Sequence, residues 1–119
     1  MWKLYYQGSV GGQALTGMPI IKRLHEKRAA KIWPFETGWR PLAPADLDGV
    51  EAVFAEIYPS LLAPKPNKGE TKDEAQVRAA CEHFNARDEK GQLAAMLGPA
   101  KDDPRREIVE REEGWILGV

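Results

Sequence analysis

The chain has 119 residues, enough for one domain, and its 43% hydrophobic and 29% charged residues are typical of a globular protein rather than a disordered one. A formal net charge of −1 provides no overall attraction for nucleic acid or for an anionic membrane. The single cysteine excludes an intrachain disulfide, and we find neither a signal-peptide pattern nor an apolar run of about 20 residues that could cross a bilayer. We therefore expect a cytoplasmic protein with no membrane partner.

The first third of the chain predicts a helix and a strand. Apolar residues recur at helical spacing after a glycine-rich start. Pro19 is expected to divide this region into a short turn or helix and a longer helix over residues 19–28, because proline suits a first helical turn. Residues 31–35 predict a short strand that ends near Pro34.

The most strand-like segment is residues 52–58, whose nearly continuous apolar run predicts burial on both faces. It follows a loop over residues 36–50 with one turn near residues 44–48. The roughly fifteen residues between the two strands allow an abbreviated crossover, so the strands suit a parallel pair. Two strands alone leave open hydrogen-bonding edges and an uncovered apolar face, so we expect a homo-oligomer.

A helix is predicted after an exposed loop over residues 63–70. Thr71 and Glu74 form a capping-box pattern that begins this helix. The residues expected on its apolar face are Val77, Ala80, Cys81 and Phe84. Cys81 is therefore expected to be a small buried side chain.

Two shorter helices are predicted near the end of the sequence. Asp88 is expected to cap the first, which ends before Gly98. Asp103 and the proline after it begin the second, with Ile108 and Val109 facing inward. The apolar residues 114–119 are expected to pack against the core.

Gly11 and Gly12 are candidates for phosphate binding, because backbone N–H groups at the start of a helix attract anions. The surrounding sequence matches neither the dinucleotide-binding pattern nor the P-loop. A tight turn with close helix packing is the alternative for these glycines.

Glu56 interrupts an apolar strand, and a carboxylate there must be paired, bound to a metal or left at the rim. Asp73, near the start of the next helix, could face the same end of the sheet, and the two could hold Mg²⁺ or Mn²⁺. The alternatives are an ion pair for Glu56 and compensation of the helix dipole for Asp73.

Charged residues are segregated along the chain. A basic run covers residues 22–31, where His25 is expected to be solvated, and an acid-rich stretch covers residues 102–113. Such runs are typical of solvated helix faces, and their opposite signs would also allow pairing between subunits.

Four segments carry a resemblance to a known family: residues 8–17 (GSVGGQALTG), 33–36 (WPFE), 55–60 (AEIYPS) and 113–119 (EGWILGV). Together they resemble a bacterial domain-of-unknown-function family with a ribonuclease-H-like core, some members of which are labelled molybdopterin-guanine dinucleotide biosynthesis proteins. The resemblance implies a ribonuclease-H-like half-domain in which this chain corresponds to the C-terminal portion of a longer fold. It also implies that Glu56 and Asp73 match acidic residues of the family, while the first acidic residue lies in the missing portion.

Three hypotheses follow for the function. The first is a ribonuclease-H-like α/β domain related to metal-dependent phosphoryl transfer on nucleic acids or nucleotides. The second is a non-catalytic module for oligomerisation or assembly. The third, which depends on the family label, is a role near molybdopterin-guanine dinucleotide biosynthesis.

Overall fold

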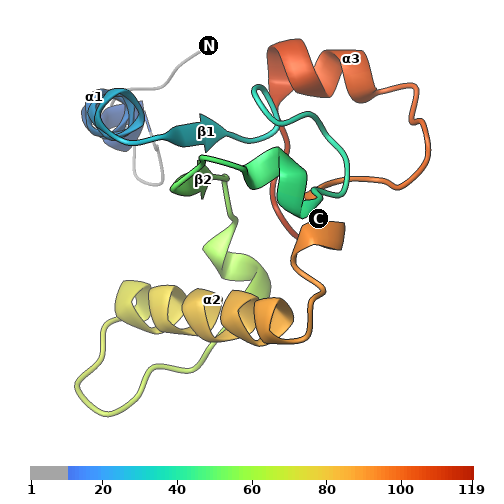
Figure 1. Cartoon of the computed structure of the whole chain (residues 1–119). Helices are drawn as coiled ribbons and strands as arrows, with labels where there is room; N and C mark the ends of the chain where they lie inside the picture. Colours follow the sequence, from blue (N-terminus) through green and yellow to red (C-terminus); the bar gives the residue numbers. More distant parts are fainter. Residues whose placement is uncertain (1–10) are drawn as a thin grey trace.

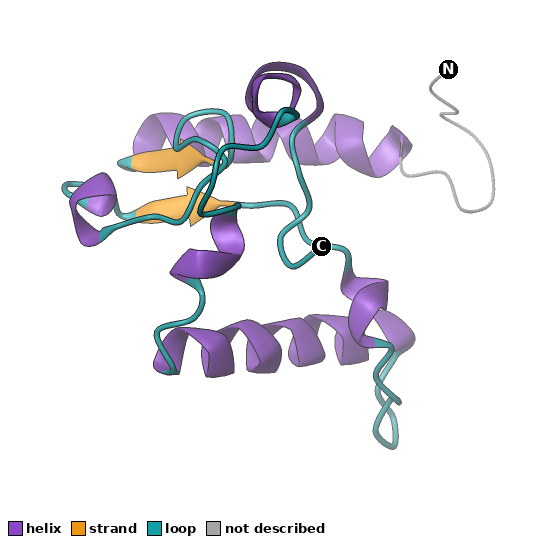
Figure 2. Ribbon diagram, turned by 90° about the vertical axis from the view of Figure 1, so that its right-hand side faces the viewer, coloured by secondary structure: helices purple, strands orange, loops and turns teal. Residues whose placement is uncertain are grey.

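The structure is a computed structural model that describes residues 11–119. Its elements in chain order are α1 (Gly11–Lys27), β1 (Ala30–Ile32), β2 (Ala52–Phe54), α2 (Lys72–Glu89) and α3 (Arg106–Ile108) (Figure 1). The shorter helical turns are η1 (Pro44–Leu47), η2 (Pro59–Leu62), η3 (Ala94–Leu97) and η4 (Val109–Glu113), the last of which continues α3. The predicted mixed α/β class is confirmed, and the two strands lie between α1 and α2 (Figure 2).

The two strands are parallel, as predicted, with Lys31 opposite Val53. The predicted strand over residues 52–58 is shorter than expected, because regular pairing stops at Phe54. Beyond it an isolated parallel bridge joins Glu56 to Ile116. The segment after η4 therefore lies beside the chain that continues β2, and this central path has a neighbour on each side. The three residues of β2 are half-buried rather than buried on both faces.

Hydrogen bonds cover part of each side of this small sheet, so its edges are less open than two strands alone would leave them. On the β1 side, the Ile32 N–H donates to the Glu36 carboxylate at 2.6 Å, and the Glu36 N–H donates to the Ile32 carbonyl at 2.8 Å. On the β2 side, the Leu117 N–H donates to the Glu56 carbonyl at 2.8 Å. A side chain and a single bridge thus occupy groups that would otherwise pair with another strand.

The core is built where the segment after β1 meets the C-terminal segment. Its buried members are Trp33, Trp39, Val109 and Leu117. The Trp33 indole N–H donates to the Leu97 carbonyl at 2.8 Å, and the rings of Trp39 and Trp115 lie 4.7 Å apart. The apolar C-terminal residues therefore pack against the core, as the sequence predicts.

Helix α1 is continuous through Pro19, so the predicted division at this residue is wrong. Proline has no N–H, which removes the bond to the carbonyl of Leu15. Both residues are exposed, so the ring meets no packed neighbour and water can hydrate the carbonyl. The helix accommodates the proline because so little of its surface is buried.

Helix α2 begins at the predicted capping box: the Glu74 N–H donates to the Thr71 hydroxyl at 3.3 Å, and the Thr71 N–H donates to the Glu74 carboxylate at 2.7 Å. The helix continues to Glu89, so Asp88 lies inside it and caps no second helix. Its predicted apolar face is only partly correct. Ala80 is buried and Phe84 half-buried, whereas Val77 and Cys81 are exposed.

Near the end of the chain, two neighbouring residues also differ in burial. Val109 is buried as predicted, but Ile108 is exposed. Within the predicted loop over residues 36–50, the turn near residues 44–48 is confirmed as η1. Periodicity alone therefore does not determine which residues of a helix are buried.

Candidate functional site

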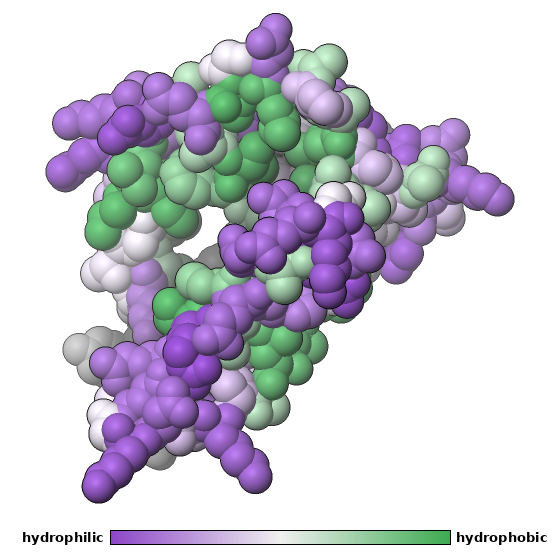
Figure 3. All heavy atoms as spheres, turned by 60° about the horizontal axis from the view of Figure 1, so that its bottom comes forward, coloured by the Kyte–Doolittle hydropathy of each residue, from purple (hydrophilic) through white to green (hydrophobic). Residues whose placement is uncertain are grey.

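The most unusual surface of the molecule is helix α1. Its five large apolar side chains are between 41% and 59% exposed, and Gly11 is its only buried residue among those the structure describes. These side chains are Leu15, Met18, Ile20, Ile21 and Leu24. Figure 3 shows apolar side chains gathered around a hollow on one face of the molecule. Contiguous exposed apolar surface of this kind marks binding sites, whereas single exposed apolar residues are ordinary.

A groove of about 520 Å³ separates α1 from the strands, and we call it the α1 groove. One wall is the face of α1 that carries Ala14, Gly17, Met18 and Ile21. The other walls are the ends of both strands, the turn around Phe35, and the segment from Glu113 to Trp115. Most of the lining is apolar, and its charged members are Glu56 and Glu113.

A carboxylate fixes α1 beside the sheet. His25 Nε2 lies 2.9 Å and 3.1 Å from the two carboxylate oxygens of Glu36, the residue that also accepts the edge N–H of Ile32. His25 is half-buried rather than solvated, so that expectation is wrong. Sequence reasoning missed Glu36 as a functional residue. Its position four residues after the strand end gives no signal of its own.

Two basic residues of α1 and three acidic residues, two of which line the groove, form no ion pairs among residues 11–119. The basic residues are Arg23 and Lys27, and the acidic residues are Glu56, Glu112 and Glu113. All five side chains belong to exposed residues. Neighbouring acids are already engaged: Glu107 pairs with Arg111, and Glu110 accepts the Trp39 N–H at 2.6 Å.

The predicted metal ligands are not brought into one groove. Glu56 is exposed and lines the α1 groove, whereas Asp73 is exposed in the first turn of α2 and is absent from the groove lining. Among residues 11–119, no group of three or more His, Cys, Asp or Glu side chains is arranged to hold a metal. Metal binding by Glu56 and Asp73 stays a prediction.

The predicted phosphate-binding glycines are the first two residues of α1, which is the predicted place at a helix start. Gly11 is buried and Gly12 is exposed, with open space where a side chain on Gly12 would lie. Close packing therefore does not require glycine at position 12. Gly8, part of the same motif, lies outside the described residues, and phosphate binding stays a prediction.

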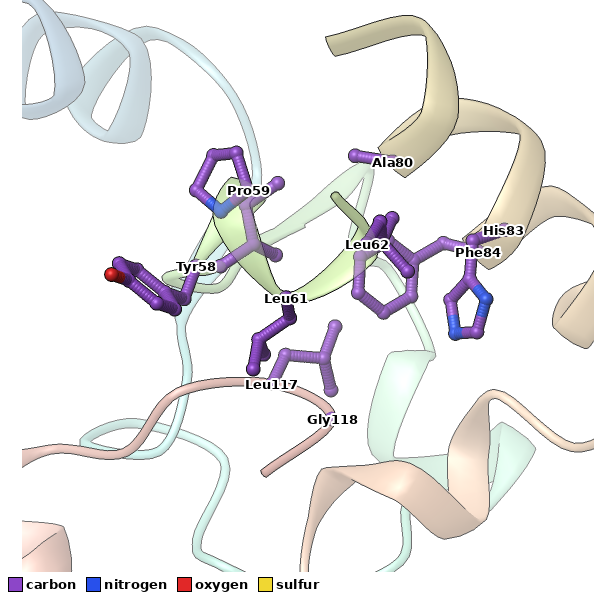
Figure 4. Close-up of a pocket in the computed structure, with 10 residues that line it drawn as sticks. Tyr58, Pro59, Leu61, Leu62, Ala80, His83, Phe84, Leu117 and Gly118 are labelled. Atoms are coloured by element: carbon purple, nitrogen blue, oxygen red, sulfur yellow. The ribbon is translucent and has the colours of Figure 1, made fainter. Parts of the chain in front are cut away.

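A second, smaller pocket of about 280 Å³ lies between η2, α2 and the C-terminal segment (Figure 4). Leu61, Leu62, Phe84 and Leu117 make it apolar. The Tyr58 hydroxyl and the His83 ring lie at opposite ends in Figure 4 rather than converging on one point. Because a specific ligand site needs a few convergent polar groups, this pocket offers no evident chemistry.

The carboxyl groups with clearly lowered pKa values lie away from the α1 groove: Asp46, Glu70 and Asp103 are in ion pairs with arginines, and Glu74 accepts hydrogen bonds from Thr71. Hydrogen bonds from Arg78 lower the pKa of Glu70 to about 2, and hydrogen bonds from Arg105 lower that of Asp103 to about 2. The Arg105 guanidinium also lies 5.3 Å and 5.1 Å from the ring centres of Trp39 and Trp115. Perturbed pKa values often mark catalytic sites, but here each has a structural partner that explains it.

Comparisons with family models, curated proteins and solved structures gave no match to this chain. In the part of the chain that the structure describes, none of the helices combines the length and the apolar character needed to span a bilayer. The class that the fold and the site define is thus a small α/β domain with an exposed apolar helix beside a groove.

Proposed function

We propose that this protein is a non-catalytic assembly module that binds a second copy of itself through α1 and the α1 groove. The observation that supports this most directly is the exposure of the five large apolar side chains on one helix. Complete burial of such a side chain stabilises a protein by about 1.5–3 kcal/mol. At roughly half exposure, each would contribute about 1 kcal/mol more when a partner covers it.

The hydrogen bonds at Ile32 and Glu56 favour this mode of assembly over strand addition at those positions. Glu36 and the bridge from Glu56 to Ile116 occupy the edges, so a second copy has no open strand at these positions to extend. A helix with an apolar surface and a neighbouring groove instead offers side-chain contacts, as in other interfaces where an amphipathic helix enters a groove.

Light scattering coupled to size-exclusion chromatography tests this proposal. The wild type is expected to be a dimer or higher oligomer at tens of micromolar, and Met18→Glu is expected to be a monomer because it places a charge in the covered surface. Val77→Glu is the matched control, since Val77 is 61% exposed but lies on α2. It should leave the oligomer unchanged. A wild-type monomer with a native circular dichroism spectrum would refute the proposal.

A second proposal keeps the ribonuclease-H-like hypothesis, in which the domain binds a hard divalent cation for phosphoryl transfer. The exposed carboxylate of Glu56, just beyond β2 and in the same groove as Glu113, supports it. With few protein ligands and the rest water, affinity for Mg²⁺ or Mn²⁺ would be about millimolar. Mn²⁺ should broaden NMR signals near Glu56 and Glu113, and Glu56→Gln should abolish the effect. Unchanged signals at several millimolar Mn²⁺ would contradict it.

A further inference from the structure

The proposed assembly leaves open which surface of the second copy receives α1. We infer that the basic half of α1 from one protomer docks against the acidic wall of the α1 groove in its partner, and that the two protomers exchange this contact reciprocally. This inference rests on the proposed function and adds the chemistry of recognition. The acidic wall is defined here as Glu56 and Glu113, which line the groove, together with Glu112, which precedes Glu113 in the chain and is exposed outside the groove lining.

Helix α1 has two adjoining faces with apolar residues, and the residues of only one of them line its own groove. Ala14, Gly17, Met18 and Ile21 have the spacing i, i+3, i+4 and i+7, so they share one face, and all of them line the groove. A second set repeats this spacing on another face: Ile20, Arg23, Leu24 and Lys27. Every member of the second set is exposed. That face therefore presents two apolar side chains flanked by two cations.

The acidic wall complements this second face in charge. Neither Arg23 nor Lys27 is used in an ion pair by any residue from 11 to 119, and the same is true of the three acids of the wall. Phe35, which is 48% exposed, and the half-buried Trp115 line the groove beside the acids. They would supply apolar surface for Ile20 and Leu24. Complementary potentials of this kind fix the orientation of partners.

Two-fold symmetry makes the arrangement testable, because every contact in such a dimer occurs twice. The variant Arg23→Glu/Lys27→Glu places acid against acid at both contacts. The variant Glu112→Lys/Glu113→Lys places base against base at both. We expect each variant to raise the dimer Kd by about tenfold or more, and we expect both to keep the wild-type fold because the substituted residues are exposed.

Mixing the two variants provides the decisive measurement. In the mixed dimer, the acidic α1 of one chain faces the basic wall of the other, and the unchanged α1 faces an unchanged wall. Light scattering should therefore show a heterodimer with a Kd within a few-fold of the wild type, and added salt should weaken it. The control is Lys65→Glu/Lys68→Glu, two exposed lysines in the loop before α2, which should change nothing.

The possible failures are distinguishable. A monomeric wild type would refute both the assembly module and this docking mode. A wild-type dimer that Met18→Glu disrupts, but that tolerates both charge reversals or is not restored by mixing, would refute the docking mode alone. Restoration only in the mixture would support the reciprocal contact.

Discussion

Gly98 should be the least replaceable glycine among those with a positive φ. Its φ of 143° and ψ of 174° lie in a region that is open almost only to glycine, and forcing another residue into it costs about 1–3 kcal/mol. A Cβ atom at this position would also lie closer than 3.0 Å to backbone atoms of Trp39 and Arg40. Backbone cannot rotate away as a side chain can, so overpacking adds about 1–3 kcal/mol. Gly98→Ala should therefore lower the free energy of unfolding by about 3 kcal/mol or more.

Gly91→Ala is the matched control, because Gly91 has a φ of 64° but open space around its Cβ position. Only the left-handed conformation is strained there, at about 1–2 kcal/mol. Urea denaturation followed by tryptophan fluorescence would measure both variants, with dichroism to establish that each one folds. A small domain has a free energy of unfolding of about 5–15 kcal/mol, so the Gly98→Ala variant is expected to be only marginally stable. Equal denaturation midpoints for the two variants would refute the close contact of Gly98 with residues 39 and 40.

Three further predictions concern single side chains. Trp33→Phe should destabilise the fold by about 2 kcal/mol in thermal denaturation, because it removes the hydrogen bond to Leu97 and leaves a small cavity; a loss below about 0.5 kcal/mol would contradict this. Arg78 lowers the pKa of Glu70 in the folded protein to about 2. The pair therefore stabilises the fold fully at a pH above the usual pKa of a glutamate, and this stabilisation is lost as the pH falls towards 2. Glu70→Gln should flatten this part of the curve of stability against pH, and an unchanged curve would count against it. The exposed Cys81 should react with a disulfide reagent in the native protein about as fast as in urea, whereas slow native reaction would indicate burial.

The sequence predicted features that depend on neighbouring residues. The capping box is one example, because Thr71 and Glu74 satisfy each other's backbone groups without help from the rest of the fold. The parallel pair is another, since the length of the connection restricts how two strands can meet. The turn at η1 follows from local proline and aspartate, whose carboxylate accepts the Ala43 N–H at 2.7 Å.

Features that depend on what packs against an element were predicted less well. Val77 and Cys81 share an apolar pattern with Ala80, but only Ala80 meets the core. In the same way, the spacing of apolar residues in α1 indicates a helix without showing that its large apolar side chains stay about half exposed. Leu15 and Ile20 lie on other sides of the helix than the groove face. Apolar residues on several sides of one helix were the available signal that some of them would be exposed.

The Glu36 carboxylate could not have been predicted from local sequence, because its partners belong to two different elements. It accepts a backbone N–H from β1 and contacts His25 of α1, and the second contact exists only after the helix has packed. Such tertiary contacts carry no periodic pattern.

The shallow burial of α1 also determines how the molecule opens. With one buried residue, an internal proline and a single carboxylate clamp at His25, α1 should separate from the strands at a lower free energy than the core around Trp33 needs to unfold. Its amides would then exchange with deuterium through a local opening, while those of β2 would exchange only when the whole domain unfolds. A second copy seated on α1 would slow that exchange in proportion to its occupancy, so the rate measured at this one helix would depend on protein concentration.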